Sequence, residues 1–293
     1  MISICEVGLR DGLQNEKKIV STEQKVALIK KLIDAGITYF EAVSFVNPKV
    51  VPQMADAEEV IRLAPKKEGI TYAGLVLSRS GLERALQTSV DRLHIVLALS
   101  NEFNQRNARR TVEQSVEELS QVIKEGAQAG KEITATLGTA FGCPFEGDVP
   151  VERTLHVADT FLNAGASAIT LADTTGLANP KQVLDIVKEF SRTFGSTSLL
   201  GLHFHNTRGL GLANVLAGYM AGVRHFDSSI AGLGGCPFAP KAVGNVCTED
   251  MVNMFHEMGV STNTDLEQLI EAALWIENIM ERRLDGMMMK VHS

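Results

Sequence analysis

Eight short segments with strand-like composition alternate along this chain with longer amphipathic segments. The longer segments show helical periodicity, as in STEQKVALIKKLIDAG, where Ser21 or Thr22 can cap the helix and Gly36 can end it. Strands that alternate strictly with helices pair in parallel, so eight such units predict a (β/α)8 TIM barrel. The predicted strands are residues 2–7, 38–43, 71–77, 92–98, 132–138, 168–172, 199–205 and 225–230.

An open, doubly wound sheet is the alternative fold, but the first strand is not followed by the GxGxxG turn that such a sheet often carries. The 293 residues, 45% of them hydrophobic, suffice for one large α/β domain. We therefore expect a single barrel domain over residues 1–293. The barrel should occupy about 1–260, followed by a short C-terminal helical extension with a helix over about 264–285.

Charge and cysteine content restrict the classes of partner. The 28 basic and 35 acidic residues give a net charge of −7 without any basic block, so we expect no nucleic acid or membrane partner. The sequence shows neither a signal peptide nor eighteen consecutive apolar residues. Four cysteines stand far apart without a C-x-x-C pair, which is typical of reduced thiols in a cytoplasmic protein.

Polar residues cluster where the predicted strands end. In a barrel of this type the active site lies at the C-terminal ends of the strands. One polar residue at a strand end is ordinary capping, whereas charged residues that converge from several strands indicate a site. These residues are Arg10 and Asp11 after the first strand, Glu41 late in the second, Asp173 after the sixth, and His203 and His205 at the end of the seventh.

The segment HFHNTRG, which begins at His203, suggests a metal site. Because side chains alternate along a strand, His203 and His205 should share one face. The alternative is a pair of partly buried structural histidines. Together with Asp11 they form a ligand set suited to Mg²⁺, Mn²⁺, Zn²⁺ or non-haem Fe²⁺, with open positions that favour a Lewis-acid role. Arg10 could donate to an oxyanion there, or form a surface pair with Asp11.

The loop AGLGGCPFAPKAVGN follows the eighth predicted strand. Its glycines allow a lid that closes over a substrate, although a plain turn is the alternative. Cys236 in this loop can serve as proton donor or nucleophile, or be an inert small side chain. Asn245 at the end of the loop offers either a neutral oxygen ligand or an N-cap for the next helix.

Several longer motifs resemble one enzyme family. The segment EVGLRDGLQNEKKIVSTEQKVALIKKLIDAGITYFEAVSFVNPKVVPQMAD closely resembles the start of 3-hydroxy-3-methylglutaryl-CoA (HMG-CoA) lyases, bacterial members especially. GCPFEG at 142–147, LADTTG at 171–176 and GLGGCPFAPKAVGNVCTED at 232–250 are also similar to theirs. The resemblance covers essentially the whole chain, and the glycine-rich cysteine loop is its most specific motif.

The resemblance implies a metal-dependent barrel enzyme, often dimeric, that cleaves HMG-CoA to acetyl-CoA and acetoacetate, a step of leucine degradation. The ligands of a divalent cation, Mg²⁺ or Mn²⁺, would be Asp11, His203, His205 and Asn245. Arg10 would bind the acyl-CoA substrate and stabilise the enolate, which Cys236 would protonate. A histidine, or Glu41 acting through water, would be the base. We expect Asp173 to orient Arg10 or a histidine.

The sequence departs from the family pattern at the predicted pocket. His205 is followed by Asn206 rather than aspartate, as in Claisen-condensing synthases such as isopropylmalate synthase. Thr134 and Thr136 stand where larger arginine and tyrosine are expected. These changes spare the metal ligands but alter the pocket, so a lyase for another branched 3-hydroxyacyl-CoA, such as citramalyl-CoA, is the alternative. A synthase is less favoured because the chain ends soon after the barrel, and a non-catalytic barrel because the residue set is complete.

Overall fold

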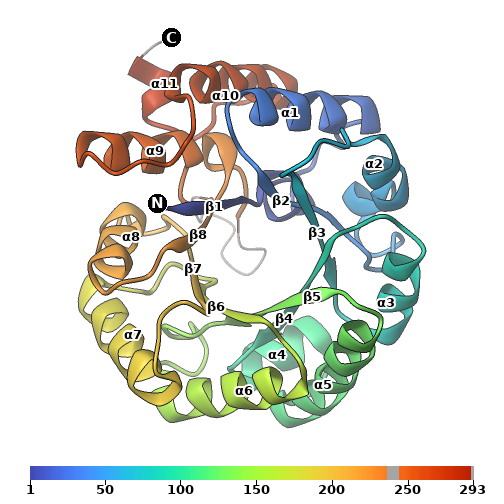
Figure 1. The fold of residues 1–293 in the computed structure, drawn as a ribbon, viewed down its shortest axis with the longest axis vertical. Coiled ribbons are helices and arrows are strands. Elements are labelled where there is room, and N and C mark those ends of the chain that lie inside the picture. The colour runs from blue at the N-terminus through green and yellow to red at the C-terminus, as the bar shows by residue number, and fades with distance from the viewer. Residues whose placement is uncertain (236–243, 292–293) are drawn as a thin grey trace.

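The structure, a computed structural model, describes residues 1–235 and 244–291. The described residues form a closed barrel of parallel strands in sequence order, with the last strand paired to the first. Each predicted strand overlaps one observed strand, and the predicted (β/α)8 fold is confirmed (Figure 1). The strands are β1 (Ser3–Glu6), β2 (Tyr39–Ser44), β3 (Thr71–Val76), β4 (Arg92–Ala98), β5 (Glu132–Gly138), β6 (Ala168–Asp173), β7 (Leu200–Phe204) and β8 (His225–Ser228).

Helices surround the strands as an outer ring (Figure 1). The predicted C-terminal helical extension is present as α10 and α11, and α10 packs against α1 and α9. The helices are α1 (Thr22–Asp34), α2 (Ala57–Leu63), α3 (Arg79–Leu86), α4 (Asn101–Ala108), α5 (Val112–Gln128), α6 (Val151–Ala164), α7 (Pro180–Phe194), α8 (Gly211–Met220), α9 (Thr248–Glu257), α10 (Leu266–Met280) and α11 (Met288–Val291).

Several helices begin at side chains that cap them. Ser21 caps α1 in a reciprocal arrangement with Gln24, because each side chain accepts a hydrogen bond from the other residue's backbone N–H. Thr111 and Asn179 begin α5 and α7 in the same way. After the end of α1 the chain turns at Gly36, whose φ of 92° is easily adopted by glycine.

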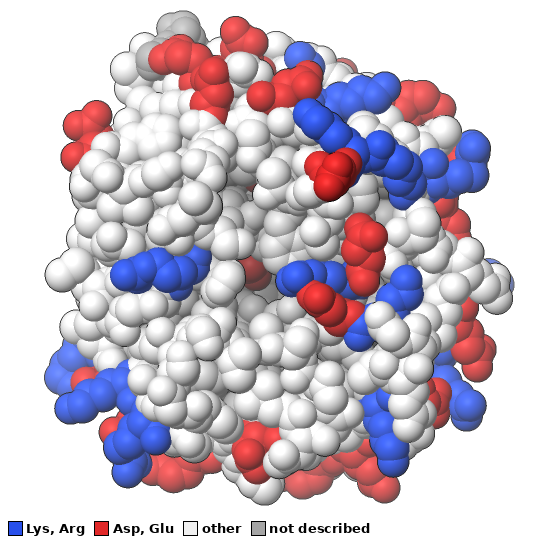
Figure 2. Space-filling view, in the orientation of Figure 1, with Lys and Arg blue, Asp and Glu red and all other residues white. Residues whose placement is uncertain are grey.

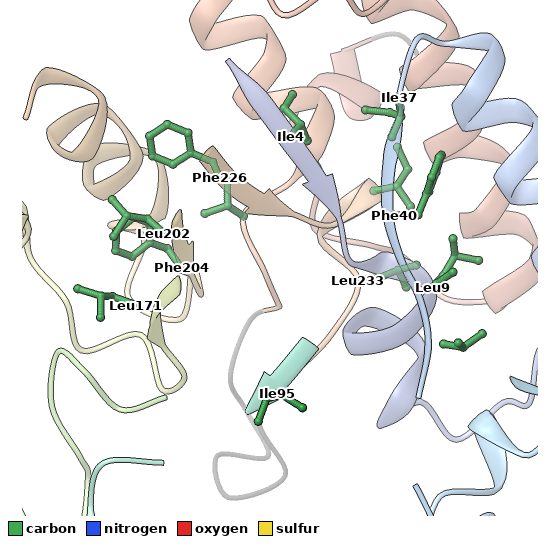
Figure 3. Close-up of a cluster of buried hydrophobic side chains, with 14 of the residues drawn as sticks. Ile4, Leu9, Ile37, Phe40, Ile95, Leu171, Leu202, Phe204, Phe226 and Leu233 are labelled. Atoms are coloured by element: carbon green, nitrogen blue, oxygen red, sulfur yellow. The ribbon is translucent and has the colours of Figure 1, made fainter. Parts of the chain in front are cut away.

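Alternation along the strands separates an apolar outer face of the barrel from a polar inner face. Phe40, Leu202 and Phe204 are almost fully buried on the outer face, between the strands and the helices (Figure 3). Their neighbours Glu41 and His203 therefore face the barrel interior. The apolar outer layer fixes the register of each strand, and this register aims the polar side chains at one cavity.

Acidic and basic side chains occur together on the face shown in Figure 2, around a central hollow and separated by uncharged areas. This mixed distribution agrees with the modest net charge of −7. Within the described ranges, no helix has the length and apolar character needed to span a bilayer.

A buried carboxyl group joins the two ends of the barrel sheet. Glu6, at the end of β1, accepts hydrogen bonds from the Gly8 backbone N–H (2.8 Å), the Ile230 N–H (2.9 Å) and the Thr248 hydroxyl (2.5 Å). Burial raises the pKa of Glu6 to about 7, although these three donors oppose the rise. Glu6 thus ties the turn after β1 to the chain that follows β8.

Glu249 is a second buried acid beside this junction. Its Oε2 accepts a hydrogen bond from the Ala231 N–H at 3.0 Å, and its Oε1 has no partner within the described residues. Burial, reinforced by the charge of Asp250, raises the pKa of Glu249 from 4.5 to about 8. The folded protein therefore holds a proton here that the unfolded chain releases above pH 4.5, so stability must fall as pH rises from about 5 to about 8.

We expect the substitution Glu249→Gln to flatten this pH dependence, because the amide cannot ionise. The wild-type free energy of unfolding should lose on the order of 1 kcal/mol per pH unit through this group, and the variant should lack that part of the slope. Urea unfolding between pH 5 and pH 9 measures it. Glu257→Gln, at an exposed position of the same helix, is the control. Equal slopes for Glu249→Gln and wild type would contradict the assignment.

Candidate active site

A π-helical turn over Gly8–Gly12 positions Arg10 and Asp11 after β1. In this turn the Gly12 N–H donates to the Val7 carbonyl at 3.1 Å, five residues back. Consecutive residues of a strand face opposite sides, whereas this turn brings both side chains to the same cavity. π-helical turns are rare in proteins, and those that do occur are often found at functional sites. The sequence prediction placed these residues at a strand end but did not foresee the turn.

Asp11, His203 and His205 come together as a candidate metal centre. One ligand atom from each of the three side chains lies within 4.8 Å of the others. His203 is the last residue but one of β7, and His205 directly follows the strand and pairs by an isolated β-bridge with Asn245. Both histidines are buried and their ring centroids are 5.2 Å apart. The predicted shared face of the two histidines is therefore present.

Two buried polar atoms beside this cluster support a cation site. Within the described residues, His205 Nδ1 and Asn245 Oδ1 have no hydrogen-bond partner. Orphaned buried acceptors are costly unless an ion or water satisfies them. Asn245 also donates to Asp11 Oδ2 at 2.9 Å and to the Leu233 carbonyl at 3.1 Å. It is not the N-cap of α9, because Cys247 occupies that position. Carboxylate, imidazole and amide groups together fit a divalent cation.

The charges of the cluster favour ligation. Burial would raise the pKa of the Asp11 carboxyl, but the Arg10 guanidinium outweighs it and holds that pKa below its usual range. Burial lowers the pKa of His205 to about 4, with His203 contributing. At neutral pH, Asp11 is thus ionised and His205 is uncharged, which are the states that bind metal.

Asp227 is a site residue that the sequence prediction missed. It lies on β8 in register with His203, and its Oδ2 is 3.1 Å from His203 Nδ1. Burial would lower the pKa of His203, but the hydrogen bond and charge of Asp227 raise it. The contact would leave Nε2 of His203 free to bind a cation, and a carboxylate that orients the ring in this way is common for metal-binding histidines. A strand-by-strand count of inward-facing positions would have found Asp227.

Arg10 is held between two carboxylates. Its Nε donates to Glu41 Oε2 at 2.5 Å, and its Nη1 donates to Asp11 Oδ1 at 2.7 Å. Its exposed fraction is only 9%, so the pair with Asp11 is not the surface pair considered as the alternative. Burial would raise the pKa of Glu41, but the charge of Arg10 and the hydrogen bond from His94 lower it. Both oxygens of Glu41 are hydrogen-bonded, which suits a group that holds Arg10 better than a general base.

Asp173 differs from the expectation. Its carboxyl oxygens accept hydrogen bonds from the Leu177 and Ala178 backbone N–H groups at 2.8 and 3.1 Å. Ala172 and Thr174, its neighbours on either side, line the cavity, so alternation directs Asp173 to the other face. Asp173 therefore stabilises the turn after β6 and does not hydrogen-bond to Arg10 or a histidine within the described residues. The prediction rested on the place of Asp173 at the end of a strand and did not consider to which face of the sheet its side chain points.

A cavity of about 450 Å³ opens over these groups. The polar residues that line it include Arg10, Asp11, His203 and His205, and Thr136 lines it as well. Apolar side chains also line the cavity, among them Val46, Val50, Val51, Leu75, Leu77, Val96 and Phe103. A cavity lined by apolar side chains and a few converging polar groups suits a small organic substrate.

Cys236 and Asn206 are two further residues singled out in the sequence. Cys236 lies outside the described residues. Asn206, the departure noted after His205, accepts a hydrogen bond from the Gly211 N–H at 3.0 Å. It thus supports the start of α8, and the departure does not alter the ligand cluster.

Known proteins similar to this chain agree with the geometry. The HMGL-like family model matches residues 1–276. The hydroxymethylglutaryl-CoA lyase of Bacillus subtilis is 39% identical over 290 residues, covering 99% of this chain and 97% of the relative. The (R)-citramalyl-CoA lyase of Chloroflexus aurantiacus is 37% identical over 299 residues, covering 99% and 94%. The structure of an HMG-CoA lyase from Acinetobacter baumannii with coenzyme A and 3-methylmalate has a TM-score of 0.94 and 41% identity, covering 99% and 94%.

We expect His205→Ala to weaken Mn²⁺ binding by at least about tenfold, because it removes one of the clustered donors. Titration calorimetry of the purified protein measures this directly. His256→Ala, which removes an exposed histidine on α9, should bind Mn²⁺ as the wild type does. Unchanged affinity in His205→Ala would remove His205 from the metal site.

Proposed function

The chain belongs to the HMGL-like family, and on that premise we propose that it cleaves 3-hydroxy-3-methylglutaryl-CoA to acetyl-CoA and acetoacetate in a metal-dependent reaction. The observation that carries this proposal is the convergence of Arg10 with the Asp11, His203 and His205 cluster at one cavity. A retro-Claisen cleavage needs both a site for a cation and a separate donor to an enolate oxygen.

The metal would be held by Asp11, His203, His205 and Asn245. When bound, a divalent cation supplies Lewis-acid polarisation of the substrate oxygens. Asp227 orients His203, and the ion pair with Arg10 keeps Asp11 ionised. The apolar side chains that line the cavity would limit water around a bound substrate, which strengthens electrostatic interactions with the polar lining residues.

In the reaction, the C3 hydroxyl loses its proton to a base and the C2–C3 bond breaks. The C3–O group becomes the ketone of acetoacetate, and the bond electrons pass to C2 and the thioester oxygen of the departing acetyl-CoA. Arg10 stabilises this enolate oxygen through its guanidinium. The base expected from the sequence is a histidine or Glu41 acting through water, and both oxygens of Glu41 are engaged by His94 and Arg10.

Cys236 is the proposed acid that protonates C2 of the enolate and completes acetyl-CoA. Its support is the resemblance of the GLGGCPFAPKAVGN motif to the lyase family. The three other cysteines, Cys5, Cys143 and Cys247, are buried, and burial raises the pKa of the Cys5 and Cys247 thiols well above the ordinary value. Buried thiols with raised pKa values are poor candidates for this step.

The family resemblance also supports four finer proposals. Mg²⁺ or Mn²⁺ is the proposed ion, a choice that agrees with the oxygen donors of the cluster. A homodimer is the proposed assembly, the cytoplasm the proposed location, and leucine degradation the proposed pathway.

A panel of 3-hydroxyacyl-CoA thioesters assayed with Mg²⁺ and with Mn²⁺ tests the proposed function. Mass spectrometry should identify acetyl-CoA and acetoacetate from HMG-CoA, and addition of EDTA should abolish their formation. Absence of cleavage for every member of the panel, with metal present, would overturn the proposal.

Citramalyl-CoA is the second candidate substrate, and two observations favour it. A relative of nearly full-length coverage is named (R)-citramalyl-CoA lyase. The cavity is also lined by the small side chain of Thr136. In the same panel, this candidate predicts a higher kcat/KM for citramalyl-CoA than for HMG-CoA, with pyruvate as the second product.

Arg10→Met tests the enolate donor. We expect kcat to fall by roughly 10²–10³-fold, because the substitution removes the charge-assisted donor while keeping a long side chain. Steady-state kinetics and circular dichroism measure activity and fold. Arg62→Met, which removes an exposed arginine on α2, should leave kcat unchanged. Near-normal turnover by Arg10→Met would exclude this role.

Cys236→Ser tests the proton donor. Turnover should fall by about 10²–10⁴-fold, because a hydroxyl is a far weaker acid than a thiol, while KM changes much less. In the wild type, Cys236 should be alkylated faster than the three buried cysteines, and substrate should protect it. Fast turnover by the serine variant together with no protection would leave Cys236 without a catalytic role.

A further inference from the structure

His94 lies in the barrel interior with both ring nitrogens engaged. Its Nδ1 is 2.9 Å from Glu41 Oε1, and its Nε2 is 2.5 Å from the Tyr39 hydroxyl oxygen. The side chain of His94 is 6% exposed and that of Glu41 is 2% exposed. Tyr39 and Glu41 both face inward from β2, whereas His94 comes from β4. The contact therefore joins two strands that are not neighbours in the sheet.

The sequence of the intervening strand leaves room for this contact. Ala73 on β3 is in register with Glu41, so it faces the same interior. Its methyl group does not extend across the space between β2 and β4. On the other side, His94 is in register with Thr134 of β5, one of the small residues noted in the sequence. On β3 the residue in register with His94 is the apolar Leu75, so His94 is the only titratable side chain among these register partners.

The proton positions in this contact follow from the partners. Glu41 is ionised beside Arg10 and can only accept, so His94 Nδ1–H donates to it. Burial raises the pKa of the Tyr39 hydroxyl, which therefore keeps its proton and donates to His94 Nε2. Tyr39 selects one tautomer of His94, and that tautomer presents a donor to Glu41. The chain of contacts continues from Glu41 Oε2 to Arg10 Nε.

Without His94, Glu41 would keep Arg10 as a partner at one oxygen only. Its Oε1 would become a buried acceptor without a donor, and the carboxylate could rotate about its χ3 torsion. The guanidinium of Arg10 is a planar fork, so its direction depends on the carboxylate that receives it.

We propose that His94, held by Tyr39, is a positioning residue that fixes the Glu41 carboxylate and thereby aims the Arg10 guanidinium at the enolate. This inference rests on the proposed lyase activity and assigns a role to two residues that touch neither the metal cluster nor Arg10 directly. It predicts a defect in kcat rather than in metal or substrate binding, because a misdirected Arg10 guanidinium stabilises less well the negative charge that develops on the enolate oxygen in the transition state.

His94→Leu and His94→Asn test the first link. His94→Leu removes both contacts and should lower kcat by about tenfold to a hundredfold, the range for groups that orient an active-site side chain. His94→Asn keeps an amide N–H near the position of Nδ1 and should recover a large part of that loss. KM and the Mn²⁺ dissociation constant should stay within about twofold of wild type in both. Equal kcat losses for the two variants, or none for His94→Leu, would overturn the proposal.

Tyr39→Phe tests the second link with a smaller change to packing. It should lower kcat in the same direction as His94→Leu but by less, because Nδ1 can still reach Glu41. Tyr72→Phe is the matched control, since the Tyr72 hydroxyl donates to the Pro65 carbonyl away from the cavity. Tyr72→Phe should change Tm by about as much as Tyr39→Phe does, but it should not lower kcat. A loss of kcat that Tyr72→Phe shares would assign the effect to packing and overturn the proposal.

Combining His94→Leu with Arg10→Met separates positioning from a general structural role. If His94 acts through Arg10, the loss caused by His94→Leu should shrink to about twofold or less once Arg10 is absent. The same fold-loss in both backgrounds would show that His94 acts independently of Arg10. A wild-type protein that cleaves no thioester of the panel would overturn the lyase function itself. A wild type that cleaves, with an unaffected His94→Leu, would overturn only the positioning role.

Discussion

The ion pairs of Arg10 are the interaction on which the rest of the site depends. Arg10 is only 9% exposed, so burial of its charge is tolerated only if opposite charges match it, and here two carboxylates do so. One of them, Asp11, belongs to the candidate metal cluster, and the other, Glu41, contacts His94. Arg10 therefore couples the cation site to the interior of the barrel. Its two partners lie in the turn after β1 and on β2, and the contact of Glu41 with His94 extends to β4.

Much of the fold was predictable because its signals are local and periodic. Strand-like and helical segments alternate in the sequence, and alternation within β7 correctly placed His203 and His205 on one face. The same alternation of side chains explains the error at Asp173. Its place at a strand end was recognised, but the face of the sheet to which its side chain points was not considered. The same reasoning, applied to every strand, would have included Asp227.

Other parts of the site were not predictable because they depend on distant partners. Nothing in the local composition of GLRDG indicates a π-helical turn, which forms where Glu6 receives the Gly8 N–H and also contacts residues beyond β8. His94 lies in the middle of a strand, and only the closed barrel, with Ala73 between the strands, brings it to Glu41. Such contacts join residues far apart in sequence, whereas periodicity reports only neighbours.

The closure of the barrel has a consequence for how the protein acquires activity during synthesis. The hydrogen bond from Asn245 to Asp11 joins residues 234 positions apart, and that from Thr248 to Glu6 joins residues 242 positions apart. A nascent chain can build most of its strands before either contact exists, and such long-range contacts form late. The cation cluster is therefore assembled only when the two ends of the chain meet. An unfinished or truncated polypeptide contains Arg10 and Asp11 but lacks Asn245 and the contacts that close the barrel, so it has no complete site. The site is therefore complete only when folding is complete.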